Sequence, residues 1–412
     1  MRFLVVVGIL AVLVSPAFGA EKATVAQVEQ ILAEAAAKSH AAQHQPRSSG
    51  EVAEIADSDL LPRVDDSVLS RLAGIELLDR MSTLTLYRLV GQYKLDSHAQ
   101  MLLQQMADHS ALLKLPAGEE IPLAAPDAET QSAIFNAARD YVFGKLSHLP
   151  DFVALRTTTT FDNAPAALKL LQSGTESAGY QRREVTQKQI TFRDGKEVLE
   201  PSAGASAVNT DNSVFQSSGE FGTEAAVVLM DLQQGIVAFD HWENTMGGVA
   251  AVFRYSVPRA TSHYEVTDRC DEHGRFHDIP AYHGVVALSP RSGAILRLTL
   301  EADTDQGDPV SHVASVIEYG PVVIGSQRSI CPLRSIAFMV QEARGCSRGS
   351  HKLQKPIALV NQTIFSNYHR FGSASTMVFD AADTGDSVAG VASHGKAARD
   401  ENTKTSTERP QP

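Results

Sequence analysis

The hydrophobic period of the sequence changes after Leu149-Pro150, and this change limits the possible folds more than any other feature. Before it, apolar residues recur every three or four positions, as in Val25, Val28 and Ile31, which predicts several short amphipathic helices. Directly after it, the segment DFVALRTTTTF alternates its side chains with a period of two, which is typical of a β-strand. The chain is therefore predicted to be an α+β protein whose helical N-terminal region precedes a sheet.

Strand-like segments follow one another at short intervals from residue 151 to residue 371. Short connections favour antiparallel neighbours, because a parallel pair needs a long crossover. The clearest hairpin is AYHGVVALSPRSGAILRLTLEAD, residues 281–303, in which a Ser-Pro-Arg-Ser-Gly turn joins two apolar runs. One apolar helix, at about residues 222–232, interrupts the series. This half of the chain is thus predicted to hold one large antiparallel sheet that is covered in part by a helix.

The two ends of the chain differ from its centre. Residues 1–19 combine Arg2, an apolar stretch and a small-residue cleavage site, which predicts a signal peptide and a periplasmic or secreted protein. No later apolar run reaches the roughly 18 residues of a membrane-spanning helix, so no transmembrane segment is expected in the mature chain. The remaining predicted parts are a helical region at 20–115, a linker at 116–127, a β domain at 128–379 and a disordered polar tail at 380–412.

The formal net charge of −12 argues against a nucleic-acid partner, because phosphate binding requires clustered Lys and Arg. The sequence also lacks a nucleophile elbow, a phosphate-binding loop and a dinucleotide fingerprint. No catalytic residue and no cofactor are therefore assigned. Paired carboxylates for glycoside cleavage meet only in space, so the sequence selects none.

Histidines gather between His241 and His283 with carboxylates close by, and these are the side chains that a zinc or iron site requires. The densest piece is CDEHGRFHD. Its spacing differs from the His-Glu-x-x-His pattern, and Gly274 disfavours the helix that would bring His273 and His277 together. We expect a solvated loop here rather than a metal site.

A series of motifs in the second half of the chain comes in a recognisable order: LPDFVALRTTTTF, FRDGKE, SSGEFG before a short helix, GGVAAVFRYSVP, SHYEV, the hairpin above, and EYGPVVIG followed by ICPLRSIAF. In these motifs the segment from about Ala128 to Phe371 resembles a family of acidobacterial secreted proteins of unknown function. The order also resembles the half-barrel of the periplasmic lipoprotein carriers and of the sigma-E regulatory anti-sigma cofactor. The resemblance implies an antiparallel sheet curled around one or two helices, with an apolar concave face that holds an acyl chain or a peptide. The helical N-terminal region departs from the small carriers, which lack such a domain.

Apolar alternation along several strands supports such a face independently of the resemblance. The predicted ligand-binding residues on it are Phe253, Tyr255, Leu296, Leu298, Val313 and Phe338. The same alternation is also typical of an ordinary filled core. Three functions therefore stay open: a carrier or envelope sensor for a hydrophobic small molecule or peptide, an interaction protein with a filled sheet core, and a hydrolase or metalloenzyme that uses the histidine-rich segment.

The three cysteines permit one disulfide in an oxidising compartment and leave one thiol over. The spacing of Cys270, Cys331 and Cys346 differs from the Cys-x-x-Cys pattern of redox proteins, which favours a structural role. The family that the chain resembles tends to keep Cys270 and Cys331, and this implies a bond between them. Strand alternation would instead place Cys270 and Cys346 near the same rim, so the pairing stays a prediction.

Overall fold

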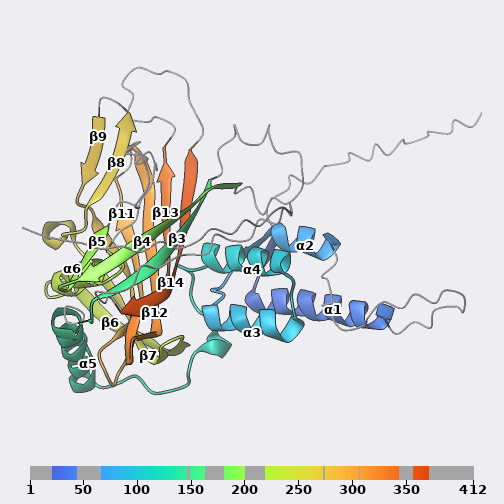
Figure 1. The fold of residues 1–412 in the computed structure, drawn as a ribbon, viewed down its shortest axis with the longest axis horizontal. Helices are drawn as coiled ribbons and strands as arrows, with labels where there is room; N and C mark the ends of the chain where they lie inside the picture. Colours follow the sequence, from blue (N-terminus) through green and yellow to red (C-terminus); the bar gives the residue numbers. More distant parts are fainter. Residues whose placement is uncertain are drawn as a thin grey trace, which may run out of the picture. The chain divides into compact units, whose positions relative to one another are not determined.

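The computed structural model describes residues 21–43, 66–145, 149–162, 181–199, 219–271, 274–305, 307–342 and 356–370. The predicted signal peptide and the predicted polar tail lie outside these residues. Within them the chain has six α-helices and a ten-stranded antiparallel sheet (Figure 1), so the predicted α+β class is confirmed.

Four helices form before residue 110: α1 (Val25–Gln43), α2 (Asp66–Ala73), α3 (Thr83–Tyr93) and α4 (Ser97–His109). We refer to them together as the helical group. Ser82 and Asp96 cap α3 and α4, because their side chains accept hydrogen bonds from backbone amides of the first turn. The apolar sides of the four helices pack in one cluster that includes Val28, Leu72 and Leu103. A short parallel pair, β1 (Glu21–Ala23) with β2 (Ile75–Leu77), joins the start of α1 to the end of α2.

The ten strands of the large sheet all pair antiparallel with their neighbours. Their order is β5-β4-β3-β14-β13-β12-β11-β10-β7-β6, so β5 and β6 are the edges of an open sheet. The strands are β3 (Phe152–Asp162), β4 (Gln181–Arg193), β5 (Lys196–Leu199), β6 (Ile236–Thr245), β7 (Gly248–Val257), β10 (Ala281–Leu288), β11 (Ile295–Asp303), β12 (Val310–Ile324), β13 (Gln327–Gln341) and β14 (Ile357–Arg370).

A separate hairpin replaces the loop that CDEHGRFHD was expected to form. It consists of β8 (Val266–Asp271) and β9 (Gly274–Asp278), which pair antiparallel. Val266 and Phe276 explain the difference, because these apolar side chains pack against other strands of the sheet and give the hairpin a buried side. Strand pairing, and not a helix, therefore sets the spacing of the histidine-rich segment.

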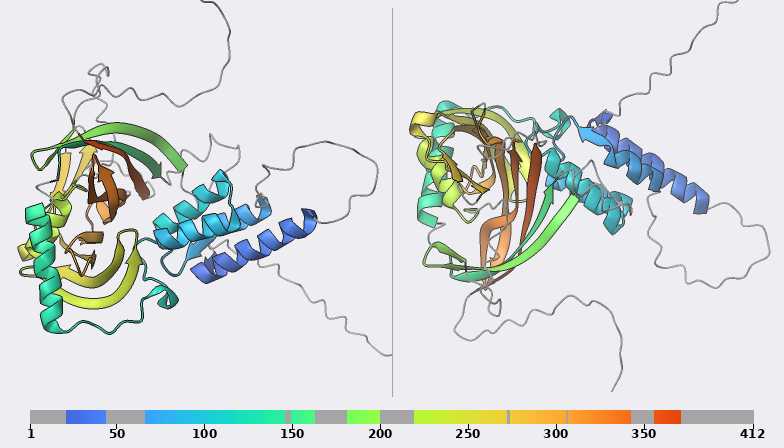
Figure 2. Two further views of the ribbon diagram at one scale, coloured as in Figure 1. Left: turned by 60° about the horizontal axis from the view of Figure 1, so that its bottom comes forward. Right: turned by 90° about the horizontal axis from the view of Figure 1, so that it is seen from above.

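One face of the large sheet packs against two helices that follow the helical group. These are α5 (Ala128–Asp140), which continues into one turn of π-helix at Tyr141–Lys145, and α6 (Thr223–Asp231). The strands in Figure 2 bend around the side on which α5 and α6 lie. We call this side the inner face and the opposite side the outer face. None of the described helices is long and apolar enough to span a membrane.

The hairpin of β10 and β11 is pinned to α5 through its turn. The Gly293 amide donates to the Ser289 carbonyl at 3.0 Å, and Gly293 adopts a φ of +71°. A side chain at this position would lie 2.1 Å from the carbonyl oxygen of Ala137 in α5. Glycine is therefore required twice over, by the backbone conformation and by the close approach of the helix.

The segment predicted as a linker runs along the edge of the sheet. Ile121 forms a β-bridge with Trp242 of β6, and the Trp242 Nε1 donates to the Ala124 carbonyl at 2.9 Å. Trp242 also packs against Phe239, with ring centroids 5.6 Å apart. The single tryptophan thus fastens the connection between the helical group and α5 to strand β6.

Candidate functional site

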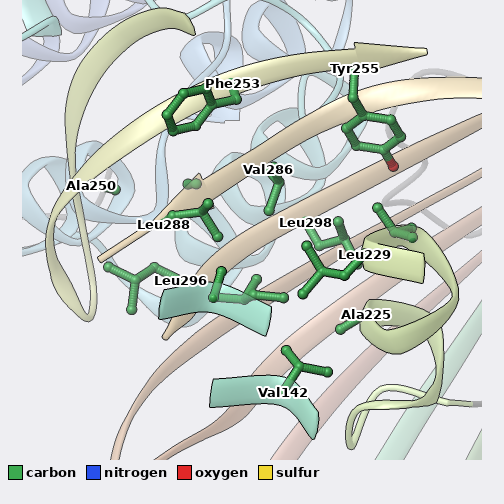
Figure 3. Packing of buried hydrophobic residues seen from close by; sticks show 14 of the residues in the cluster. Val142, Ala225, Leu229, Ala250, Phe253, Tyr255, Val286, Leu288, Leu296 and Leu298 are labelled. Atoms are coloured by element: carbon green, nitrogen blue, oxygen red, sulfur yellow. The ribbon is translucent and has the colours of Figure 1, made fainter. Parts of the chain in front are cut away.

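Four of the six predicted ligand-binding residues lie together on the inner face. Phe253, Tyr255, Leu296 and Leu298 belong to one apolar cluster with residues of α5, the π-helical turn and α6. Figure 3 shows Ala225 and Leu229 of α6 pointing toward these sheet residues. Strand register explains the grouping, because Phe253 pairs with Val286, which pairs in turn with Leu298. In this state the four side chains are buried beneath the helices.

The other two predicted residues lie elsewhere. Val313 is on the inner face but packs in a different cluster, with Met339 and Leu359, beneath the β8–β9 hairpin. Phe338 pairs with Ala314 and Val360 and points to the outer face, where it packs against the cluster that contains Ile336. The continuous apolar face predicted across all these strands therefore breaks at β13.

The inner face becomes polar where β13, β14 and β3 run side by side. Ser335, Thr363 and Thr158 occupy one row across these strands, and Asn361 and Thr160 occupy the next. The hydroxyls of Thr158 and Thr363 are 2.9 Å apart, and the Thr160 hydroxyl donates to the Asn361 side-chain oxygen at 2.8 Å. The inner face thus has an apolar half, on β7, β10 and β11, and a hydrogen-bonding half.

Polar contacts hold the start of α6 to the sheet. Arg156 of β3 forms a buried ion pair with Glu220, at 2.9 Å from Nη2 to Oε1, and the Ser335 hydroxyl donates to the same oxygen at 3.1 Å. The Tyr319 hydroxyl donates to the Glu220 backbone carbonyl at 3.0 Å. Three strands therefore bond to the residue that lies just before the helix.

Glu224, in the first turn of α6, is a second carboxylate near the start of this helix, after Glu220. It accepts a hydrogen bond from the Ser315 hydroxyl of β12. Part of the residue remains exposed, but its carboxyl group lies against the sheet. Burial there raises the pKa of Glu224 to about 7, the Ser315 hydrogen bond opposes this, and the negative charge of Glu220 adds to it.

The last residue of α6, Asp231, fastens the other end. Its buried carboxylate accepts hydrogen bonds from the Tyr282 hydroxyl at 2.8 Å, the His263 backbone amide at 2.9 Å and the His263 Nδ1 at 2.5 Å. The His263 ring is largely exposed. Among the described residues no hydroxyl or thiol is hydrogen-bonded to its other ring nitrogen.

Packing of α6 against the sheet is expected to weaken as the pH rises from about 4.5 to about 7. When α6 is packed, Glu224 binds its proton with a pKa of about 7, whereas an exposed glutamate has a value of 4.5, so acid favours the packed helix. Above pH 7 the carboxyl is ionised whether or not the helix is packed, and the packing changes no further. Hydrogen exchange of the α6 amides, corrected for its intrinsic pH dependence, measures this. In a Glu224→Gln variant the protection is expected to stay nearly constant, and an equal pH response in both proteins would contradict the assignment to Glu224.

Sequence reasoning missed the residues that hold α6. The sequence did carry one signal, because Glu220, Glu224 and Asp231 flank or interrupt an otherwise apolar helix. Nothing in the sequence named their partners, since Arg156 lies 64 residues from Glu220 and Tyr282 lies 51 residues from Asp231.

The predicted disulfide remains a prediction. Cys331 of β13 is a buried free thiol in this structure, and burial raises its pKa to about 12, so it is a poor nucleophile. The side chain of Cys270 and all of Cys346 lie outside the described residues. Among the described residues, no group of three or more histidine, cysteine, aspartate or glutamate side chains is arranged to hold a metal ion.

Comparison of the chain with protein-family models, with curated proteins and with solved structures finds no match.

Proposed function

We propose that this chain is an exported protein that binds a hydrophobic ligand, a lipid acyl chain or an apolar peptide, against the apolar half of the inner face. The sheet would act as a half-barrel around the ligand, and α6 is the element that moves aside. A carrier and an envelope sensor would both use such a site. The observation that carries the proposal is that α6, a short helix, covers the apolar half together with α5, while polar contacts at the two ends of α6 hold it in place.

A ligand that takes the place of α6 in the core must have an extended apolar part, because it has to bury as much apolar surface as the helix does. Val228 and Leu229 are the large α6 side chains in the core, and burial of each stabilises the closed form by about 1.5–3 kcal/mol. Each buried methylene group of a ligand contributes about 0.8 kcal/mol. An acyl chain that buries about four to eight methylene groups would therefore offset the burial free energy that Val228 and Leu229 lose when α6 moves away.

The sheet can survive this exchange because backbone pairing supports it separately from α6. Strands β7, β10, β11 and β12 are joined by antiparallel ladders. The helix forms no strand pairs with them. Moving α6 therefore breaks side-chain contacts and leaves the ladders intact.

A filled core is the second candidate, and the burial of the inner-face residues favours it. Phe253 and Val286 are fully buried, and Leu298 is 1% exposed. In that case α6 would stay in place and the protein would act through its surfaces as an interaction protein. The two candidates differ in whether the unmodified chain takes up a hydrophobic ligand.

Uptake of a fluorescent fatty acid tests the proposal. We expect saturable binding with one ligand per chain and weaker binding, by about tenfold or more, for Leu298→Trp, because the indole fills space that the ligand needs. Ile364→Trp is the matched control, since Ile364 is 49% exposed on the outer face of the same sheet. It should bind as the unmodified protein does.

The outcomes separate the two candidates. Absence of saturable binding by the unmodified chain, together with a loss of about 1–3 kcal/mol of stability in Leu298→Trp, would establish a filled core and overturn the proposal. Equal losses of binding in Leu298→Trp and Ile364→Trp would show that the ligand occupies some other surface.

A further inference from the structure

Three tyrosines pack together at one end of the apolar half of the inner face. They are Tyr255 of β7, Tyr264, which precedes β8, and Tyr282 of β10, and we call them the tyrosine cluster. The ring centroids of Tyr255 and Tyr282 are 6.0 Å apart with their planes at 81°. Those of Tyr264 and Tyr282 are 5.7 Å apart at 50°. The three rings are therefore inclined to one another like the walls of a corner.

Hydrogen bonds fix two of these rings. The Tyr255 hydroxyl donates to the Thr299 backbone carbonyl of β11 at 2.6 Å, so its side chain crosses β10 at Gly284. A Cβ atom at Gly284 would lie 2.9 Å from that hydroxyl oxygen and 2.0 Å from the Thr299 carbonyl oxygen, so only glycine leaves room for this side chain. The Tyr282 hydroxyl donates to Asp231 of α6 at 2.8 Å. The sheet thus holds Tyr255 in place, and α6 holds Tyr282.

Glu224 of α6 brings a negative charge to all three rings. Burial raises the pKa of every tyrosine of the cluster, and the negative charge of Glu224 adds to the rise in each. The face of an aromatic ring also carries partial negative charge. Inclined aromatic rings with a carboxylate beside them are the arrangement that proteins use to bind ammonium groups.

Glu224 has no cation of its own. Among the described residues no arginine, lysine or histidine forms an ion pair with its carboxylate, and the charge that acts on it is the negative one of Glu220. The other two carboxylates of α6 and its start are paired, Glu220 with Arg156 and Asp231 with His263. Because an ionised carboxylate is costly to bury alone, the packed helix favours a proton on Glu224. An external cation could take the place of that proton.

We propose that the ligand of the inner face carries an ammonium group, and that this group binds at the tyrosine cluster with Glu224 as its counter-ion. The inference rests on the function proposed above, because the cluster is packed beneath α6 in this structure and Tyr255 lies on the side of the sheet that faces Leu229 (Figure 3). The helix needs to shift only far enough to admit the head group between Glu224 and the rings. An alkyl chain with a cationic head is the class of ligand that this arrangement selects.

The position of the cluster suits a head group that stays close to solvent. Tyr264 is only partly buried, and the ring of the adjacent His263 is largely exposed. From Tyr282 the inner face continues along β10 through Val286 to Leu288, a span of about 20 Å at about 3.3 Å per residue. The alkyl chain would therefore lie on the apolar half while its head binds at the rim.

Fluorescent amphiphiles that share one alkyl chain and differ only in the head group test the proposal. The probes are a trimethylammonium, a primary amine, an alcohol and a fatty acid. We expect the cationic probes to bind about tenfold more tightly than the alcohol, and the fatty acid to bind no more tightly than the alcohol. Tighter binding of the trimethylammonium than of the amine would identify a choline-type head, and the reverse order would identify an amine head that donates hydrogen bonds.

Two variants locate the head group. Tyr264→Leu removes one ring and should weaken binding of the trimethylammonium probe by about threefold to thirtyfold, while the alcohol binds as before. Glu224→Gln keeps an acceptor for the Ser315 hydroxyl and removes the charge, so the preference for a cation should fall by about tenfold. Tyr87→Leu is the matched control, because Tyr87 is a 56% exposed tyrosine of α3, and it should bind every probe as the unmodified protein does.

The outcomes separate this inference from the proposed function. Equal affinities for the cationic probes and the alcohol, or a preference for cations that survives in both Tyr264→Leu and Glu224→Gln, would overturn the inference and leave the proposed function standing. Absence of saturable binding of all four probes would overturn both. Glu224→Gln preserves the size of the side chain, so it gives the decisive reading if the melting temperature shows that Tyr264→Leu is unfolded.

Discussion

Gly293→Ala is expected to destabilise the protein by roughly 2–5 kcal/mol, a large part of the stability of an ordinary domain. A left-handed backbone at a residue with a Cβ atom costs about 1–2 kcal/mol. In addition, the new methyl group would lie 2.1 Å from the carbonyl oxygen of Ala137, so either α5 or the hairpin must shift. Such overpacking costs a further 1–3 kcal/mol, approximately. Urea denaturation followed by circular dichroism measures the sum.

Gly325→Ala isolates the backbone contribution. Gly325 has a φ of +65° in the turn between β12 and β13, but the nearest atom to an added Cβ is the Cδ of Arg370, at 3.3 Å. That side chain is flexible, so only the backbone cost of about 1–2 kcal/mol is expected. Equal losses for Gly293→Ala and Gly325→Ala would show that the contact between the hairpin and α5 does not constrain the fold.

Glu243→Ala is expected to cost about 3–5 kcal/mol, because it leaves Arg80 buried without its ion-pair partner. Burial raises the pKa of Glu243, but Arg80, His241 and Arg297 outweigh it and hold the pKa at about 2. The carboxylate therefore stabilises the fold fully above pH 4.5, and this contribution is lost as the pH falls from about 4.5 to about 2.

A double variant separates the ion pair from simple packing. In Arg80→Met with Glu243→Leu, both charges are removed together, so the loss should be clearly smaller than for Glu243→Ala alone. Urea denaturation at pH 7 and at pH 3 measures both effects. A double variant as unstable as the sum of its two single variants would mean that the two residues act independently.

Strand periodicity predicted the sheet well because it is a local property of the chain. Alternation in residues 151–162 and 281–303 reflects which side of each strand is buried, and these segments became β3, β10 and β11. The apolar run before Asp231 predicted α6 for the same reason. The residues singled out on β7 and β11 pack together on the inner face, since only one side of their alternation is large and apolar.

The prediction failed at β13 because both faces of that strand are buried. Ile336 and Phe338 pack on the outer face, while Ala337 and Met339 lie on the inner face, so the sequence offers two apolar alternations and no local reason to choose. The pairing register with β12 and β14 decides which face each β13 side chain occupies, and that register depends on the whole sheet. The contact with Ala111 that covers the outer side comes from more than 200 residues away.

Local sequence patterns specify the α+β class, the antiparallel pairing, the apolar helix over the sheet and the glycine turn of the central hairpin. Each of these depends on residues that are close together in the chain. The carboxylates that hold α6, the partner of the buried Arg80 and the face that each β13 side chain occupies are set by the tertiary structure. Burial, charge balance and pKa depend on distances in space. The hydrogen-bond partners of Arg156, Arg297 and Glu224 lie 64, 186 and 91 residues away in the sequence.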